Sequence, residues 1–477
     1  MKEKLVIGII ADTSHPAAVE RLLGDLVELA RLDVGLAALD VILLENPSGP
    51  EKHRIQWDAH GLVTAHCIGR STQEADCRRG WFGNLKVDSE RLPISTARTL
   101  LQRYAHEHTR HDRACVWILD EDLRLHPLLD AIRRGERCLS EHIACLRDER
   151  IDVAIGPVLG APPLPARSSV RVNLEDVVRH LREFGDLGPR ALWPDRSAAN
   201  ALLRTRYPEY YYDLTTAHED PGRLTYWMEP RCVGETVESV FARLAAVFPG
   251  LIDGVPITRM IPLDREYVVP SIGLARGGNT LIIEPRLFGR IPNIVPIFDG
   301  RACRRSDMVW ARLAAHLEGA RFARVPLPVW QDRTGPGRSG FDEDKLVDDA
   351  RGSALVRTMD RLISEGMLSQ RTRISPETAR CAAGIFHENL AARMDAIRRS
   401  EARAHHLLDE IDAYASKRLD DATFTNGRLQ LKEGVAALRA AMGNSPQHPD
   451  MRADSMVVER FFLDMHAELV EYRRGAG

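Results

Sequence analysis

Short, continuous apolar runs alternate with helix-like stretches through residues 1–160, and this alternation constrains the fold more than any other feature of the chain. A strand that is apolar along its whole length has to be covered on both faces. Such strands, separated by helices, are typical of a mostly parallel sheet with helices on both sides. The runs are Leu5–Ile10, Val41–Leu44, Gly61–Ile68, Cys115–Leu119 and Asp152–Val158.

The middle of the chain departs from this alternation. Two amphipathic stretches, Asn173–Phe184 and Glu235–Phe248, flank an irregular segment rich in aromatic residues, which we expect to form a core rather than to stack on a ligand. Strand-like runs return at Val268–Ala275, Thr280–Ile283 and Phe322–Val329. We therefore predict an α/β domain over residues 1–335 that carries a helical, aromatic insertion at 165–265.

Strand-like runs stop after residue 335. Gly335–Gly340 indicates a flexible link, and Ser375 is placed to cap a long helix whose first position is Pro376. Apolar residues follow at three- and four-residue spacing, interrupted at Glu401, and a second long helix is expected at about Met456–Tyr472. These patterns predict an α-helical C-terminal region over residues 336–477 in which the two helices pack antiparallel.

Composition narrows the class of protein. Lys and Arg number 65 against 68 Asp and Glu, so the net charge of −3 gives no reason to expect nucleic acid as a partner. The eight cysteines include no C-x-x-C pair, which fits reduced thiols. No apolar run of about 20 residues predicts a transmembrane segment, and the N-terminus lacks a secretory pattern. We expect a soluble, cytoplasmic protein.

The strongest chemical signal is Asp120-Glu121-Asp122, directly after the apolar run Cys115–Leu119. Two carboxylates one residue apart at the end of a strand can hold Mg²⁺ or Mn²⁺, which prefer oxygen ligands. The alternative is that Asp120 and Asp122 only cap the following turn. The same tripeptide recurs at Asp342-Glu343-Asp344, where it follows the flexible link, and there we predict a solvated helix start.

The order of these segments resembles the nucleotide-binding half of family 2-like GT-A glycosyltransferases. The resemblance lies in the first strand with its following loop, the second strand ending in ENPSG, the helix ISTARTLLQRYA and the strand CVWILDED. It implies a GT-A-type, Rossmann-like sheet and Mn²⁺ or Mg²⁺ held by Asp120 and Asp122. It assigns contacts with the nucleotide-sugar donor to Ala11, Asp12, Thr13, Glu45, Arg98, Asp120 and Glu121.

A second part of the resemblance covers residues 268–335. Asn279, which opens an apolar strand, and Gln331 and Asp332, which follow the last strand, are expected to contact the acceptor. Similar enzymes often place a His ligand near that last strand. This chain has none there, which leaves the third metal ligand open, with Asp332 and water as the candidates.

The segment Arg304-Arg305-Ser306-Asp307 resembles the acidic motif that opens a helix beside the acceptor. The resemblance implies that Asp307 is the general base of a single displacement with inversion. Asp307 can instead pair with Arg304 or Arg305 at a helix start. Arg304 and Arg305 are expected to bind donor phosphate; otherwise they are surface charge.

The leading hypothesis is therefore a metal-dependent glycosyltransferase that uses a UDP- or GDP-sugar and an unknown acceptor. A nucleotidyltransferase is an alternative, although the loop ADTSHP lacks the Gly and Lys of many phosphate loops in that class. A third hypothesis is a non-catalytic GT-A-like scaffold that binds a partner through the C-terminal helices, which are also a candidate homodimer contact.

Overall fold

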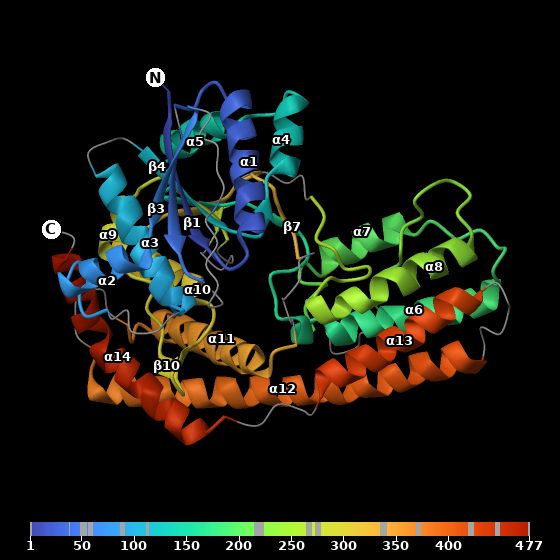
Figure 1. Cartoon of the computed structure of the whole chain (residues 1–477). Helices are drawn as coiled ribbons and strands as arrows, with labels where there is room; N and C mark the ends of the chain where they lie inside the picture. Colours follow the sequence, from blue (N-terminus) through green and yellow to red (C-terminus); the bar gives the residue numbers. More distant parts are fainter. Residues whose placement is uncertain are drawn as a thin grey trace.

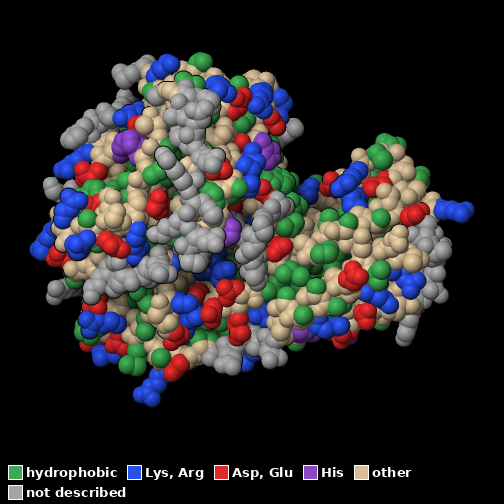
Figure 2. Space-filling model, viewed as in Figure 1, with side chains coloured by type: hydrophobic (Ala, Val, Ile, Leu, Met, Phe, Trp, Pro, Cys, Tyr) green, Lys and Arg blue, Asp and Glu red, His purple; other side chains and the backbone are tan. Residues whose placement is uncertain are grey.

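The computed structural model describes residues 2–37, 39–47, 55, 61–85, 91–110, 114–213, 224–263, 270–271, 278–333, 341–368, 374–417, 424–443 and 449–475. Two lobes lie side by side, and one long helix runs along both (Figure 1). We call the part built on the large β-sheet the sheet lobe, and the part built from packed helices the helical lobe. Figure 2 shows a notch between the lobes and charges of both signs interspersed over the viewed face.

The sheet lobe contains an eight-stranded sheet with the order β3-β2-β1-β4-β9-β6-β12-β8. Its strands are β1 (Lys4–Ala11), β2 (Leu39–Glu45), β3 (Val63–Ile68), β4 (Ala114–Asp120), β6 (Val153–Ile155), β8 (Pro270–Ser271), β9 (Asn279–Ile282) and β12 (Phe322–Arg324). β9 is antiparallel to β4 and β6, and β8 is antiparallel to β12, whereas the other neighbours are parallel. The predicted mixed, mostly parallel α/β sheet is confirmed.

Helices cover both faces of this sheet, as the continuous apolar strands require. One face carries α1 (Pro16–Leu32), α4 (His126–Arg133) and α5 (Leu139–Asp148). The other carries α3 (Ile94–Thr109), α9 (Arg286–Arg290) and α10 (Ser306–Glu318), with α2 (Arg70–Arg78) beside them (Figure 1). Within β1, Leu5 and Ile7 pack under the first group, while Val6 packs under the second. Gly8 leaves room for Ile118 of β4 and Leu101 of α3, because a Cβ at Gly8 would lie 2.7 Å from Cδ1 of Ile118 and 3.3 Å from Cγ of Leu101.

Prolines divide two of the predicted strands. The run Asp152–Val158 becomes β6 and β7 (Val158–Gly160), which are separated by Pro157. In the same way Phe322–Val329 becomes β12 and β13 (Val329–Gln331). A proline cannot donate to a strand ladder, so the chain changes sheet there. β7 and β13 join β5 (Leu123–Arg124) in a separate three-stranded sheet, and β10 (Ile297–Phe298) pairs with β11 (Arg301–Ala302).

The helical lobe has its own apolar core. It contains η1 (Ala166–Ser168), α6 (Val170–Leu187), α7 (Ser197–Arg206), α8 (Val237–Val247), η4 (Phe248–Asp253) and α13 (Thr425–Met442). Tyr210 stacks on Tyr226 with ring centroids 4.6 Å apart, and both side chains are buried. These aromatic side chains of the insertion therefore pack in the interior, as expected.

The C-terminal region is α-helical, as predicted, and its helices pack into the cores of both lobes. They are α11 (Glu343–Ser364), α12 (Pro376–Lys417), α13 and α14 (Met451–Arg474). The first half of α12, including Leu390, packs with α11 and α14 in the sheet-lobe core. Its second half, including Leu408, packs with α6 and α13 in the helical-lobe core. Helical spacing shows that a face is buried but not what buries it.

Glu401, which interrupts the apolar stripe of α12, lies at the point where this helix passes from one core to the other. Glu401 is buried there and forms an ion pair with Arg167, with Nε and Oε1 2.9 Å apart. A buried charge needs a partner of opposite charge, and Arg167 is the partner of Glu401. A charged side chain therefore takes the place of an apolar one at this point of the stripe. The predicted pairing of the two long C-terminal helices is confirmed by the packing of α14 on α12.

Two predicted helix starts have different outcomes. The hydroxyl of Ser375 accepts a hydrogen bond from the Thr378 backbone N–H (3.1 Å), so Ser375 caps α12 as predicted. The sequence also places Ser95 to cap the helix ISTARTLLQRYA, but Ser95 does not cap α3, because that helix already begins at Ile94, after Pro93.

Some expectations fall outside the described residues, namely the link Gly335–Gly340 and most of Val268–Ala275. Within the described ranges, none of the helices is both long and apolar enough to span a bilayer. All eight cysteines are free thiols.

Candidate functional site

The candidate site lies at the edge of the sheet where the parallel strands end. β1 ends at Ala11, β2 at Glu45 and β4 at Asp120. The strand register places Ala11 beside Glu45, and Ile10 beside Asp120. The chain leaves β1 toward β2 on one side, whereas β4 lies on the other side. Ligands of open α/β sheets bind at such a switch point, beyond the carboxyl ends of the strands.

Asp120 occupies the centre of this edge. One of its oxygens lies 3.4 Å from a guanidinium nitrogen of Arg98, and its backbone N–H donates to the carbonyl of Gly278 (3.2 Å). Gly278 has a φ of 125°, and a Cβ there would lie 2.6 Å from Oδ2 of Asp120. Glycine at position 278 therefore keeps room for the carboxylate.

The Asp120 carboxyl lies in a recess, although 38% of the side chain is exposed. Desolvation raises its pKa to about 6; Arg98 acts against this rise, and the neighbouring charges of Asp122 and Asp307 add to it. A bound cation would offset the repulsion between the negative charges of Asp120, Asp122 and Asp307.

Arg98 links the strand edge to α10. Its guanidinium lies between Asp120 and Asp307, whose Oδ1 is 3.5 Å from the second guanidinium nitrogen. Burial acts to lower the pKa of Arg98, but Asp307 and Asp120 outweigh burial and raise it. Asp307 lies in the first turn of α10, where the helix dipole favours a carboxylate. The structure thus brings together three residues that the sequence assigned to metal, donor and base.

The loop after β1 is held by the middle residue of the tripeptide. The Asp12 backbone N–H donates to the Glu121 carboxylate at 2.5 Å, and the Asp12 carboxylate accepts from the Ser14 N–H at 3.0 Å. Thr13 is buried, and its hydroxyl has no hydrogen-bond partner among the described residues. Glu121 therefore fixes the backbone of the predicted donor loop at Asp12. The Thr13 hydroxyl next to it is an unsatisfied polar group among the described residues.

Asp122 faces the end of β13. Its carboxylate accepts from the side-chain amide of Gln331 (3.2 Å), and its carbonyl accepts from the Asp332 N–H (2.8 Å). The other amide atom of Gln331, Oε1, is buried without a hydrogen-bond partner among the described residues. Arg21 on α1, which the sequence did not single out, lies 3.7 Å from the Asp332 carboxylate. No sequence signal distinguishes Arg21 from other helix-surface cations.

These oxygens suit a hard cation. Mg²⁺ is usually bound by one or two carboxylates, with phosphate oxygens and waters completing the shell. Asp120 and Asp122 supply the carboxylates, and the unsatisfied Gln331 oxygen lies beside Asp122. In the described part of the chain, the one group of three metal-ligating side chains within 4.8 Å of one another lies elsewhere, at Asp40, His66 and His108. A third side-chain ligand from Asp332 therefore remains a prediction.

Asn279 departs from its predicted acceptor contact. Its side chain is 1% exposed. Its oxygen accepts from the Trp117 indole (2.8 Å), and its amide donates to the Leu327 carbonyl (2.7 Å). Asn279 therefore joins β4, β9 and the chain before β13, and its side chain is occupied by the fold.

The two arginines before α10 differ in their surroundings. Arg305 makes a two-pronged contact with Asp349 on α11, at 3.1 and 2.9 Å. Arg304 is more exposed, with its Nε 4.0 Å from the same carboxylate. Because Asp349 already fills the guanidinium fork of Arg305, this side chain is occupied by the fold, whereas the predicted contact of Arg304 with donor phosphate stays a prediction. Glu45 lies at the predicted edge, with its carboxylate directed toward Gly69 at the start of α2.

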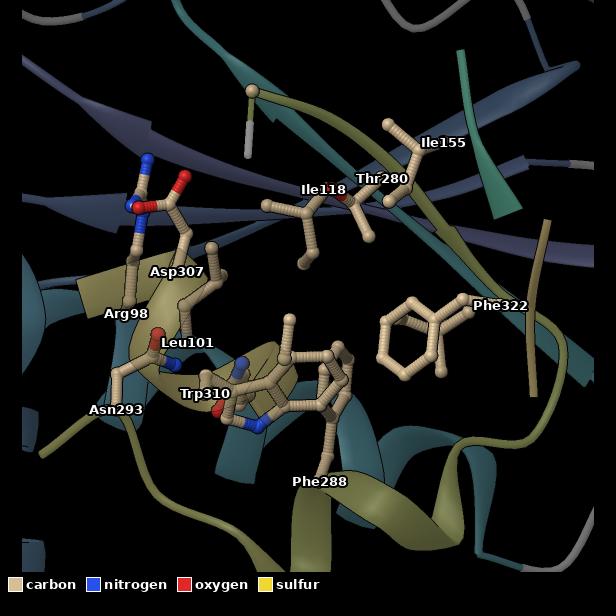
Figure 3. Close-up of a pocket in the computed structure, with 14 residues that line it drawn as sticks. Arg98, Leu101, Ile118, Ile155, Thr280, Phe288, Asn293, Asp307, Trp310 and Phe322 are labelled. Atoms are coloured by element: carbon tan, nitrogen blue, oxygen red, sulfur yellow. The ribbon is translucent and has the colours of Figure 1, made fainter. Parts of the chain in front are cut away.

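A small cavity of about 40 Å³ opens beside this cluster. Figure 3 shows Arg98 and Asp307 on one side, with Asn293 nearby, and an apolar interior formed by Ile118, Trp310 and Phe322. The cavity lies between the sheet and helices α3 and α10. It is too small for a hexose, but it leaves the Asp307 carboxylate at the boundary between a polar and an apolar space.

No protein-family model matches the chain, and no curated protein is similar enough to count as a match.

Proposed function

We propose that this protein is a metal-dependent glycosyltransferase that moves a sugar from a nucleoside-diphosphate sugar to an acceptor hydroxyl. The observation that carries the proposal is the contact of Arg98 with both Asp120 and Asp307 at the switch point of the sheet. The non-catalytic scaffold would be favoured if these residues lay apart. The resemblance to GT-A glycosyltransferases assigns the same residues to metal, donor and base.

Each acidic residue of the site, and Arg98, has its own role in the proposed reaction. Asp120 and Asp122 would hold the divalent cation, which would supply positive charge to the leaving diphosphate. Asp307 takes the proton of the acceptor hydroxyl while that oxygen attacks the anomeric carbon. The bond from that carbon to the diphosphate oxygen breaks, and its electron pair leaves on the phosphate. Attack opposite the leaving group inverts the configuration. Arg98 holds the Asp307 and Asp120 carboxylates in place.

The proposal is tested first by binding. We expect one of UDP, GDP, CDP or their sugars to raise the thermal midpoint of the full chain, and to require Mn²⁺ or Mg²⁺ for this effect. A ligand at 100 times its Kd stabilises the native state by about 2.7 kcal/mol. If no nucleotide shifts the midpoint with either metal, the glycosyltransferase assignment is wrong.

Asp122→Asn should remove the metal-dependent part of this shift and weaken donor binding by about 100-fold or more, since even outer-shell partners of a metal are worth roughly 10–100-fold. Asp344→Asn, the same substitution in the second Asp-Glu-Asp copy, is the matched control and should bind donor normally. Donor affinity that is unchanged in Asp122→Asn would contradict the metal assignment.

A further inference from the structure

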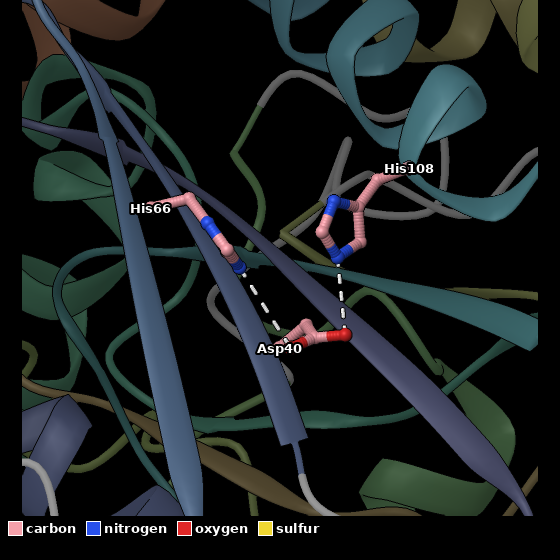
Figure 4. Close-up of side chains that lie close together, drawn as sticks. All are labelled: Asp40, His66 and His108. Atoms are coloured by element: carbon pink, nitrogen blue, oxygen red, sulfur yellow. Dashed lines mark ion pairs between the residues drawn. The ribbon is translucent and has the colours of Figure 1, made fainter.

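A cluster of one aspartate and two histidines lies away from the proposed active site. His108 Nε2 is 3.0 Å from one oxygen of Asp40, and His66 Nε2 is 3.7 Å from the other (Figure 4). The two imidazole rings have centroids 4.8 Å apart. The potential ligand atoms of the three residues all lie within 4.8 Å of one another. The cluster is partly buried, with side chains 20% to 39% exposed.

The fold creates this cluster from three separate segments. Asp40 pairs in register with Thr64, and His66 is two residues further along β3, so both side chains project from the same face of the sheet. That face is covered by α3, whose last turn carries His108. Arg98 lies in the first turns of the same helix. The cluster therefore lies near the amino ends of β1 and β2, opposite the edge that carries Asp120.

The ligand set favours a nitrogen-seeking cation. Zn²⁺ in open sites is commonly held by three protein ligands, including His nitrogen and carboxylate oxygen, with water in the fourth position. Ligand atoms of a tetrahedral site with bonds of roughly 2.0–2.1 Å are about 3.3 Å apart. The observed distances are 3.0 Å from His108 to one Asp40 oxygen and 3.7 Å from His66 to the other oxygen, so each lies close to that separation.

His66 provides a second, independent sign of a ligand. Its Nε2 atom is buried and has no hydrogen-bond partner among the described residues, although the rest of the side chain is partly exposed. An orphaned ring nitrogen that faces a carboxylate and another imidazole is placed to bind a cation. Lys4 lies 3.7 Å from the same aspartate, with a third of its side chain exposed, so its ammonium can move away when a metal binds.

We infer that Asp40, His66 and His108 form a second metal site, selective for Zn²⁺ over Mg²⁺, that ties the end of α3 to the outer strands of the sheet. Imidazole ligands suit late first-row cations, whereas Mg²⁺ and Mn²⁺ suit the oxygen ligands at Asp120 and Asp122. The inference does not depend on the proposed glycosyltransferase activity.

The test is a calorimetric titration of the metal-stripped full chain with ZnCl₂. We expect one strong site that is retained in Asp122→Asn. His66→Gln and His108→Gln should each weaken it by more than the roughly 10–100-fold that an outer-shell partner is worth. The matched control is His406→Gln, because His406 also faces a carboxylate, Glu410, at 3.3 Å but in a two-residue pair. Zn²⁺ affinity that His406→Gln lowers as much as His108→Gln does would overturn the inference.

A measurement on the unaltered chain guards against variants that fail to fold. Zn²⁺ should protect His66 and His108, and not His406, from carbethoxylation as mapped by mass spectrometry. Bound Co²⁺ should give the intense visible absorption of a four-coordinate site. Absence of protection at both histidines, or a titration without a strong site, would show that the cluster is only an ion-pair network between Asp40, the histidines and Lys4.

Discussion

Asp120-Glu121-Asp122 and Asp342-Glu343-Asp344 are the same tripeptide in two places of the fold. In the second copy, Asp342 caps α11 by accepting from the Lys345 N–H, and Asp344 is 61% exposed and pairs with Arg301. In the first copy, each carboxylate contacts a different distant segment: Asp120 meets α3, Glu121 meets the loop after β1, and Asp122 meets β13. The convergence of distant segments, and not the tripeptide, makes the candidate site.

The largest expected effect comes from substituting Asp307, which Arg98 links to Asp120 of the first tripeptide. Asp307→Asn should lower turnover by roughly 10²–10⁴-fold, the usual contribution of a general base, while donor affinity stays within a few-fold of normal. Turnover and donor Kd are measured separately with the donor found by the binding screen. Asp299→Asn, at a carboxylate that is 68% exposed, is the control. Turnover within tenfold of normal in Asp307→Asn would remove it as the base.

The second effect concerns pH. The pKa of Asp120 is raised from 3.8 to about 6, and a metal needs the ionised carboxylate, so binding weakens as pH falls through 6. Asp120 is about nine-tenths ionised at pH 7 and about one-tenth at pH 5, so Mn²⁺ affinity should fall about tenfold between them. Without metal, the raised pKa works in the opposite sense: it favours the folded state at low pH, and this benefit is lost as pH rises from about 4 to about 6. Mn²⁺ affinity that is equal at pH 5 and pH 7 would argue against Asp120 as a ligand.

The smallest effect belongs to the second copy. Asp342→Ala removes the cap of α11 and should cost about 1 kcal/mol of unfolding free energy, without changing donor binding. Asp344→Asn breaks an exposed ion pair and should cost less than about 1 kcal/mol. Urea unfolding measures both changes. Impaired donor binding in Asp342→Ala would contradict the conclusion that the second tripeptide only caps α11 and takes no part in the donor site.

The parts of the fold that local patterns control were predictable. The first strands and the position of Asp120 at a strand end follow from continuous apolar runs, because burial on both faces leaves its mark within a few residues. The junction between β12 and β13 lies inside an otherwise apolar run, and its local sequence signal is the pair of prolines Pro326 and Pro328. The contact of Arg98 with Asp307 could be expected only from resemblance, since the two lie more than 200 residues apart.

Other features had no local signature. Asp40, His66 and His108 follow no metal-binding spacing, and only the register of β2 and β3 under α3 brings them together. The packing of α12 in two cores could not be predicted from the sequence, for a different reason. Its apolar stripe is nearly uniform, so spacing alone could not show that two cores share it. Glu401 was the only sign, and its meaning depended on Arg167, more than 200 residues earlier.

That shared helix has a consequence for synthesis. The helical-lobe core combines residues 166–251 with Phe341 and with a group of residues that begins at Ala404, about 150 positions after Leu251. At roughly 5–20 residues per second, α8 would wait roughly 8–30 s on the ribosome before its α12 partners appear, and α6, which is made earlier, would wait longer. During that interval their apolar faces are uncovered, so the nascent chain is exposed to aggregation and is a natural client for chaperones. A fragment that ends near residue 335 would keep that vulnerability permanently.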